Sequence, residues 1–590
     1  MLSHDAYEPV IRRLVVFSLL LAPVTYTQPS GPIPREVRAV WVTTAAGLDW
    51  PHSANQGDQR TSLRRIVFDL HRARLNTIYF QARARGDAYY RSRFEPWAEN
   101  LTGTPGKDPD WDPLAELVRD AHSLGMEVHA WFNLFKVRGG ATPPTTTPPH
   151  PARAMPQWTV EVAGEGWLDP GVPAVREYLV TVALDLVSRY DVDGINFDFI
   201  RYPARGFPDD ATYRQYGNGT DKGVWRRQNI TGFLTTFVER ARAVRPNLKI
   251  GCSPLGIAEE PPPGSNGNGM TAFAQDAREW LRSGLVDYAS AQIYWDIGSS
   301  WRDPDFATVA REWKAASPLR QIVAGIAAYK REVLAELPRQ IDSARAVGAD
   351  GQAFFRLENI RSLTMFAGRY NAPALIPPMT WRDSVPPEPP IHISTTELAP
   401  NVFLIEWSTP PPAEDGDTAR YFSVYRDGAT AAGPSSGRTL ITLLPAPQTS
   451  FVDSITTPSA LTYRYEVRSV DRMWNESPPL PTHTAPMREV LALGRKTQHR
   501  TSLSTSLTGP NGSPSLAAYS LARRDSIRLD LVLRRPGSSD TTMMTLVHAE
   551  QEAGMHVVGL QRVAFRLGVY VLRLAAGEAV IEQLLLIQKQ

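Results

Sequence analysis

The sequence predicts an α/β protein in which a (β/α)8 TIM barrel is followed by two all-β sandwich domains. Three observations lead to this prediction. Between residues 35 and 375, short apolar runs alternate eight times with segments of helical spacing, the count and length typical of this barrel. Residues 376–390 are rich in proline and predict a stiff linker. Beyond the linker, apolar and polar residues alternate as they do in half-buried strands.

The first strand of the barrel is expected at Val37 to Val42. It runs into Thr43 to Trp50 without a glycine-rich nucleotide loop, so a doubly wound open sheet is the weaker alternative. Gly125, after the second helix, suits a helix C-cap. The other strands are expected at residues 76–81, 127–132, 193–198, 248–253, 286–294, 321–326 and 351–355, and helices at residues 60–73, 113–124 and 172–189. Residues 142–151 predict a Pro/Thr loop after the third strand.

Residues 386–485 have the pattern of a β-sandwich. Strands are expected at Phe403 to Trp407, Tyr421 to Gly428 and Tyr463 to Asp471. With a core tryptophan at the end of the first of these and a candidate tyrosine corner at Tyr463, the segment resembles a fibronectin type III module. A generic β-sandwich would show the same alternation.

In the tail, residues 495–590, apolar and polar residues also alternate. Its strands are expected at Ser526 to Leu533 and Gly568 to Leu574, and it ends in the apolar run Leu584 to Ile587. This pattern is similar to the C-terminal sorting sandwich of the type IX secretion system, which would make the secretion machinery a partner. A carbohydrate-binding module or a module that only adds stability are the alternatives.

The amino terminus has the pattern of a signal peptide. Arg12 and Arg13 precede the apolar run Leu14 to Val24, which is too short to span a bilayer, and the small and polar stretch Thr25 to Ser30 follows. We therefore expect residues 1–28 to be a signal peptide and the protein to be exported to the cell surface or the medium. A buried helix is the alternative. No later run is long enough for a membrane span.

Composition excludes several classes of protein. Of the 590 residues, 42% are hydrophobic, enough for a substantial core. A net charge of +2 does not favour nucleic acid or anionic lipid as a partner. The single cysteine, Cys252, excludes a disulfide framework and cysteine-based metal sites, and the 11 histidines lack the spacing of a zinc helix. No metal or cofactor is expected.

In a TIM barrel the active site lies at the carboxyl ends of the strands. The residues expected there are rich in aromatic rings, amides, arginines and carboxylates. Rings offer flat faces to sugars, amides and arginines bind hydroxyls, and two carboxylates are needed to cleave a glycosidic bond. They are Thr43 to Trp50, Gln81, Arg83, Arg85, Asp87, Asn133, Asp198, Arg201, Tyr202, Ser253, Pro254, Gln292, Tyr294, Trp295, Asp296, Tyr329 and Arg356 to Asn359.

Asp198 is the strongest single candidate for a catalytic carboxylate. Strand alternation turns Asn196 and Asp198 to the same face of the fourth strand. Asp193 lies at the opposite end of the strand, where a turn or capping role is expected. The structural alternative for Asp198 is an ion pair with Arg201 or Arg85.

The second carboxylate has several candidates. Asp296 follows the sixth strand, across the mouth from Asp198, and is favoured. Glu358, after the eighth strand, is next. Less favoured are Glu259 and Glu260, expected as solvated loop charges, Asp49, and Asp87, which is expected to bind the backbone of its own loop.

Eight stretches in order along residues 35–375 resemble the glycosyl hydrolase family 10-like domain of bacterial surface and secreted proteins. Two departures stand out: Phe199 occupies a position where the family often has a second acid, and Asn133 to Lys136 replaces Asn-Pro-Tyr-Arg. The stretches are residues 36–42, 80–90, 95–97, 125–133, 167–171, 192–203, 253–256 and 292–295.

This resemblance implies a TIM-barrel glycosidase acting on bacterial cell-wall glycan, including strands without peptides. It implies that Asp198 acts as nucleophile or base and that Asp296 protonates the leaving oxygen. The residues that would position or contact the sugar are Arg83, Asn133, Asn196, Tyr202, Gln292, Tyr294, Trp295 and Glu358, with Trp41 and Trp131 as stacking faces or barrel packing.

The second hypothesis is a non-catalytic glycan-binding scaffold that has kept the groove without the acid pair. A carboxylate facing Asp198 across the mouth discriminates the two hypotheses. A metal-dependent deacetylase is a weaker third, because the sequence has no ligand cluster. For either leading hypothesis the partner is a polysaccharide and the protein is expected to be a monomer.

Overall fold

The computed structural model describes most of residues 35–587. The expected signal peptide, residues 1–28, lies outside the described residues. In the described part of the chain, no helix is long and apolar enough to cross a membrane. The segments within 35–587 that are not described are residues 141–142, 204–205, 260–267, 299–303, 363–365, 367, 400, 431–432, 435–437, 447, 456–461, 482, 485–501, 507–515, 522, 535–540, 561–567 and 578.

Eight parallel strands close into a barrel, which confirms the predicted fold class. The last strand closes onto the first, with Gly351 paired to Val37. All eight expected strands are present. They are β1 (Val37–Val42), β2 (Thr77–Arg83), β3 (Glu127–Asn133), β7 (Gly194–Asp198), β8 (Lys249–Cys252), β9 (Tyr288–Gln292), β10 (Gln321–Ile326) and β11 (Gly351–Phe354).

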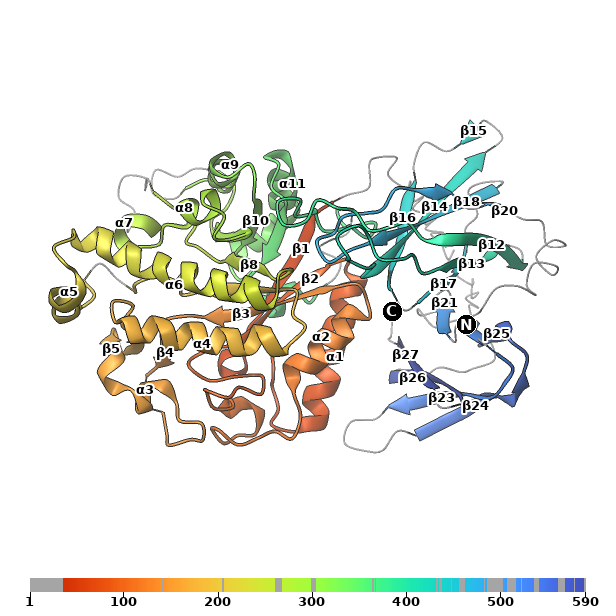
Figure 1. Ribbon diagram of the computed structural model, residues 1–590, viewed down its shortest axis with the longest axis horizontal. Helices are drawn as coiled ribbons and strands as arrows, with labels where there is room; N and C mark the ends of the chain where they lie inside the picture. Colours follow the sequence, from red (N-terminus) through yellow and green to blue (C-terminus); the bar gives the residue numbers. More distant parts are fainter. Residues whose placement is uncertain are drawn as a thin grey trace, which may run out of the picture.

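Helices cover the outside of the barrel (Figure 1). Several begin at a side chain that accepts a backbone N–H, such as Asn55 before α1 and Asp112 before α2. Phe197 of β7 packs edge-on against Phe233 and Phe237 of α6, with ring centroids 5.3 and 5.0 Å apart. The long helices are α1 (Gln56–Arg72), α2 (Pro113–His122), α4 (Pro173–Arg189), α6 (Lys222–Val244), α9 (Phe306–Ala316) and α11 (Leu337–Ala346), with the shorter α8 (Ala277–Arg282) and α10 (Arg331–Ala335).

Residues 143–150 of the predicted Pro/Thr loop contain no helix or strand, and the connection after β3 holds further structure on either side of them. It contains a three-stranded sheet in the order β4–β6–β5, formed by Lys136–Gly139, Glu165–Leu168 and Thr159–Val162. With α3 (Pro151–Ala154), α5 (Asp210–Tyr216) and α7 (Gly269–Phe273), this sheet lies at the end of the barrel far from the β-modules (Figure 1).

The interior of the barrel is crossed by a chain of polar side chains. Glu127 at the start of β3 accepts from His129 at 3.0 Å, and His129 is bonded to the Tyr288 hydroxyl at 2.6 Å. Glycines leave room for these rings: a Cβ at Gly251 would lie 2.1 Å from the Tyr288 ring, and one at Gly194 2.5 Å from His129. The glycine of the Asp-Gly-Ile-Asn segment therefore serves packing inside the barrel.

The module after the linker is a β-sandwich of two sheets that are mostly antiparallel, with β20 parallel to β12. Trp407 of one sheet and Phe422 of the other lie in one core, with ring centroids 5.4 Å apart. The fibronectin type III assignment stays a prediction. The strands are β12 (Ile391–Ala399), β13 (Val402–Ser408), β14 (Tyr421–Thr430), β15 (Gly433–Pro434), β16 (Thr439–Pro445), β17 (Ser450–Ser454), β18 (Thr462–Val470), β19 (Leu480–Pro481) and β20 (His483–Thr484).

The tail forms a second sandwich, as predicted from its alternation. Its sheets run β21–β22–β25 and β24–β23–β26–β27 and share one core that includes Tyr519 and Leu529. The sorting role stays a prediction. The strands are β21 (Ser502–Ser506), β22 (Leu516–Leu521), β23 (Asp525–Arg534), β24 (Thr541–Gln551), β25 (Gly554–Gly559), β26 (Gly568–Ala576) and β27 (Ala579–Ile587).

The first sandwich is docked on the amino-terminal ends of the barrel strands. Trp474, 1% exposed, stacks on Tyr421 at 5.7 Å, and its Nε1 donates to Glu127 at 2.5 Å. Around this contact, Arg420 and Arg472 pair with Asp191 of the barrel at 2.9 and 2.6 Å. Because the contact is apolar at its centre and charged at its edge, it resembles a permanent interface.

We expect Trp474→Ala to lower the free energy of unfolding by about 3–5 kcal/mol, because it leaves a cavity and an unpaired Glu127 oxygen in a buried interface. Chemical denaturation followed by fluorescence and circular dichroism measures the loss. The control is Leu480→Ala, at a residue that is 40% exposed in the same module. An equal effect of the two substitutions would contradict a docked interface.

Candidate active site

Asp198 lies at the mouth of the barrel as the last residue of β7, with 7% of its surface exposed. The backbone N–H of Phe199 donates to its Oδ1 at 2.6 Å, and Gln292 Nε2 donates to the same oxygen at 3.3 Å. Burial raises the pKa of Asp198, while the nearby Arg201 charge and these hydrogen bonds oppose the rise. Arg201 acts through space, because no ion pair to Asp198 forms among the described residues.

The hydrogen-bond chain inside the barrel continues up to Asp198. The Tyr288 hydroxyl accepts from Asn196 Nδ2 at 3.3 Å, and Asn196 Oδ1 accepts from Ser253 Oγ at 2.5 Å. The amide of Gln292 then donates both to the Ser253 carbonyl, at 3.2 Å, and to Asp198. Gln292 is thus held in place from below, and it holds the carboxylate.

Aromatic rings form a wall beside Asp198. Phe355 stacks on Tyr294 with centroids 5.9 Å apart, and Tyr329 meets both rings edge-on at 5.9 and 6.0 Å. Burial and the charge of Asp198 raise the pKa of Tyr294 well above 10, so its hydroxyl keeps its proton. Tyr329 is 48% exposed and presents its ring to the solvent at the mouth.

Trp131 and Asn133 of β3 complete the floor. The Trp131 indole nitrogen is buried without a hydrogen-bond partner, and it lies near enough to lower the pKa of Asp198. Asn133 pairs in register with Asp198, and its Nδ2 donates to the Ala84 carbonyl at 2.8 Å. Its Oδ1 is buried and has no partner in the described chain, so it is an acceptor available to a ligand hydroxyl.

Three residues expected to bind hydroxyls have no exposed surface, namely Arg83, Asn196 and Tyr202. Arg83 forms a forked ion pair with Glu95 at 2.7 and 2.6 Å and donates to the Leu134 carbonyl at 2.9 Å. The Tyr202 hydroxyl accepts from Asn229 at 3.2 Å. Burial gives all three supporting roles in place of direct contact with a sugar.

The favoured second acid, Asp296, is half-buried after β9. Its backbone carbonyl accepts from Phe306 N–H at 3.1 Å, and within the described chain its side chain forms no hydrogen bond or ion pair with Asp198. Trp295 is also half-buried, and its carbonyl accepts from Gln340 at 2.9 Å. Glu358 is exposed at the rim and pairs with Arg361 at 2.9 Å.

Two other carboxylates near the mouth bind the backbone. Asp49 is fully buried, accepts from Thr43 N–H and Glu358 N–H, and pairs with Arg356 at 2.6 Å, so it locks two loops together. Asp87 accepts from Arg85 N–H at 2.8 Å, which confirms the loop role expected of it. Burial also raises the pKa of Asp87, which leaves it as a further candidate for the acid. Asp193, at the base of β7, accepts from Val128 N–H, as its expected turn role requires.

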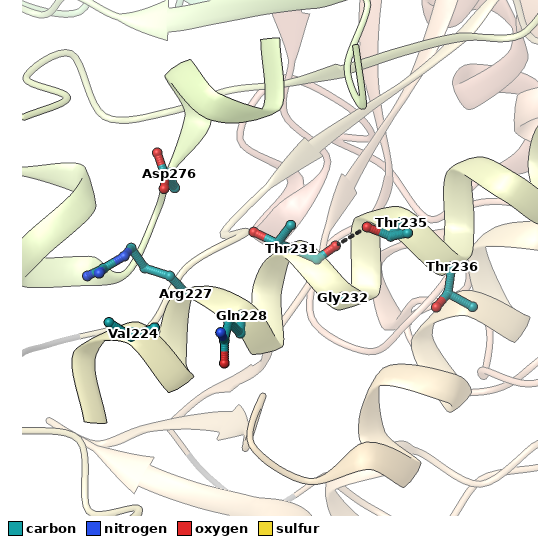
Figure 2. A pocket seen from close by; sticks show the side chains of 8 residues that line it. All are labelled: Val224, Arg227, Gln228, Thr231, Gly232, Thr235, Thr236 and Asp276. Atoms are coloured by element: carbon teal, nitrogen blue, oxygen red, sulfur yellow. Dashed lines mark hydrogen bonds between the residues drawn. The ribbon is translucent and has the colours of Figure 1, made fainter. Parts of the chain in front are cut away.

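Two features lie away from the mouth. A groove on the outer face of α6, lined by Arg227, Thr231 and Asp276 among others, belongs to the helix layer (Figure 2). Asp383, Asp415 and Asp417 gather their carboxylate oxygens within 4.8 Å of one another where the linker meets the first sandwich. Neither feature contacts the residues around Asp198.

Comparisons with known proteins identify the family. The family model described as glycosyl hydrolase-like 10 matches residues 36–338. The chain belongs to this glycosyl hydrolase-like family. Glycosyl hydrolase YngK of Bacillus subtilis is 30% identical over 481 residues, 75% of this chain and 92% of its own length. Glycosyl hydrolase DigH of Escherichia coli K12 is 32% identical over 338 residues, 52% of this chain and 76% of its own length.

Because the chain belongs to this glycosyl hydrolase-like family, the protein is a glycosidase. Among solved structures, the glycoside hydrolase domain of PgaB (BpsB) from Bordetella bronchiseptica covers 56% of this chain and 95% of its own length, at 16% identity and a TM-score of 0.35.

We expect Asp198→Asn to raise the melting temperature of this family member at neutral pH. The pKa of Asp198 in the folded state lies above 3.8, so the cost of burying its charge is absent below that pH and grows as the pH rises through the folded pKa. Melting curves of variant and wild type from about pH 3 to about pH 8 measure the difference, which should increase with pH and then level off. A lower melting temperature of the variant at neutral pH would contradict it.

Proposed function

We propose that the protein is a glycosidase that cleaves O-glycosidic bonds of a bacterial polysaccharide, namely the glycan strands of peptidoglycan, and that Asp198 is its central catalytic carboxylate. The observation that carries the proposal is the position of Asp198, buried and hydrogen-bonded at the centre of the mouth of a family barrel. Buried carboxylates with raised pKa values are typical of catalytic sites.

The chemistry assigned to Asp198 follows from its surroundings. A sugar ring held against Asp198 would place its anomeric carbon, where positive charge develops, beside a carboxylate oxygen. The amide of Gln292 and the N–H of Phe199 both donate to Oδ1 of Asp198, so Oδ2 is the oxygen available to act as nucleophile or base.

Sugar binding is assigned to the residues that have surface or unused polar atoms at the mouth. The Asn133 Oδ1 is proposed to accept a hydroxyl, and the rings of Tyr294 and Tyr329 to cover an apolar face of the sugar. Trp295 and Glu358 are proposed to line the rim. Arg83, Asn196 and Tyr202 are proposed as positioning residues, because they fix the strands and loops from which these groups extend.

The proton donor to the leaving oxygen is proposed to be Asp296, with Asp87 and Glu358 as the alternatives. The peptidoglycan assignment rests on the resemblance of the strand ends to cell-wall glycosidases. We further propose that residues 1–28 direct export, that the protein acts outside the cytoplasm as a monomer, and that the C-terminal sandwich is read by secretion machinery.

We expect Asp198→Asn to lower sugar release from peptide-free glycan strands by about 10³-fold or more while binding is retained, because the sugar contacts remain and the reacting carboxylate is lost. Release of reducing ends and binding by calorimetry are measured on the same preparations.

To identify the proton donor, Asp296→Asn, Asp87→Asn and Glu358→Gln are compared on glycan and on an aryl glycoside. The variant that lacks the catalytic acid should recover its rate of cleavage on the aryl glycoside, because the leaving group of this substrate needs no proton. Binding without release by wild type across a polysaccharide panel would favour the scaffold function.

We expect Tyr329→Ala to raise KM by about 3- to 10-fold and to change kcat little, because the ring covers bound sugar without touching the reacting atoms. Tyr329→Phe keeps the ring and is the matched control, with a KM near that of wild type. Steady-state kinetics on glycan strands measure both. Equal KM values for wild type and Tyr329→Ala would show that the sugar does not contact this ring.

A further inference from the structure

Arg201 lies in an aromatic cage beside the catalytic carboxylate. It follows Asp198 by three residues, and its guanidinium lies over the rings of Trp167, Phe199 and Phe273 at 5.9, 5.2 and 5.5 Å. The residue is half-buried. The backbone that shapes this cage is constrained, since Phe199 has φ +49°, a conformation that non-glycine residues rarely adopt.

The guanidinium of Arg201 has neither a hydrogen bond nor an ion pair among the residues that the structure describes. Other arginines near the mouth are paired: Arg83 with Glu95 at 2.6 Å and Arg356 with Asp49 at 2.6 Å. An arginine fork taken out of water is normally matched by a carboxylate or phosphate, because an uncompensated charge is costly. Arg201 therefore has binding capacity that the described chain does not use.

The charged groups around Arg201 leave its N–H donors unoccupied in the described chain. The Lys136 ammonium lies 5.0 Å from the Phe199 ring, which the Arg201 guanidinium also contacts. Lys136 forms an ion pair with Glu165 at 2.5 Å. Asp198 and Glu165 both interact with Arg201 through space, and neither forms a hydrogen bond or an ion pair with it among the described residues. A carboxylate bound at the guanidinium would complete a forked pair beside Asp198.

From this geometry we infer that Arg201 is a specificity-determining residue that binds a carboxylate carried on a sugar of the substrate, so that the enzyme selects acidic glycans over neutral ones. The inference rests on the proposed glycosidase function and adds to it the chemical class of the sugar. A carboxylate on a sugar occurs either as an ether-linked acid, as on peptide-free cell-wall strands, or as the C6 acid of a uronic sugar. We assign the ether-linked acid and test the uronic acid as the other source.

The experiment compares charged and neutral forms of the same glycan on the full-length protein. Peptide-free glycan strands are used intact and after carbodiimide coupling of their carboxylates to methylamine, with chitin oligosaccharides as a neutral backbone and oligogalacturonate as the uronic source. Binding is measured by calorimetry and cleavage by release of reducing ends. The wild-type comparison needs no variant, so it is independent of any folding defect.

Wild type is expected to bind intact strands about 10- to 100-fold more tightly than the coupled strands, the range for a charged hydrogen-bonded pair. Arg201→Gln should remove this preference, and Arg201→Lys should keep part of it. Arg311→Gln, at an exposed residue of α9, removes the same charge elsewhere and should behave as wild type. Near-ultraviolet circular dichroism verifies the fold of each variant.

Equal binding of intact and coupled strands by wild type, or an unchanged preference in folded Arg201→Gln, would overturn the inference while leaving glycosidase activity intact. Preference for oligogalacturonate over the intact strands would overturn the ether-linked assignment. Failure of wild type to bind or cleave any of the glycans, charged or neutral, would overturn the proposed function as well.

Discussion

The hydrogen-bonded chain inside the barrel is the constraint on which the other features depend. It begins at the first sandwich, where Trp474 donates to Glu127, and it ends at Gln292, which donates to Asp198. Burial alone would raise the pKa of Glu127, but Lys249 and His129 lower it, so Glu127 is an anion that can accept from every neighbour. Because Glu127 can only accept, the His129 Nε2–H donates to it, and the other ring nitrogen, Nδ1, is bonded to the Tyr288 hydroxyl. Hydrogen bonds to their neighbours thus hold the polar groups of this chain in place.

Asp198 lies in a buried position, which is unfavourable for the charged form of its carboxylate. The carboxylate is buried, and it is compensated by two hydrogen bonds and the nearby Arg201 charge in place of an ion pair. A direct ion pair would have opposed the rise in the pKa of Asp198 more strongly. It would also have occupied the carboxylate oxygen that is proposed to face the sugar. The arrangement thus lowers stability at neutral pH, a cost that suits the catalytic role proposed for Asp198.

Much of the fold was accessible from sequence, because barrel strands are short apolar runs whose order is imposed by the chain. The mouth residues Asp198 and Gln292 were found for the same reason, since the end of each strand marks the rim. What the sequence did not reveal is which polar residues are covered. Arg83 looks like a sugar ligand until Glu95, twelve residues on, is seen to bind it. The sheet β4–β6–β5 was missed because its strands of four residues are too short for a periodic signal.

The docking of the first sandwich sets the direction in which the enzyme faces a polymer. The module contacts the start of β3 through Glu127, whereas catalysis is assigned to the opposite end of the same strand and its neighbours. The barrel therefore separates the two surfaces by its full height (Figure 1). A polysaccharide bound at the mouth, as proposed, would therefore lie away from the sandwich. Anything that tethers the sandwich, such as a cell envelope, would hold the mouth pointing outward toward glycan that is not part of the anchoring layer.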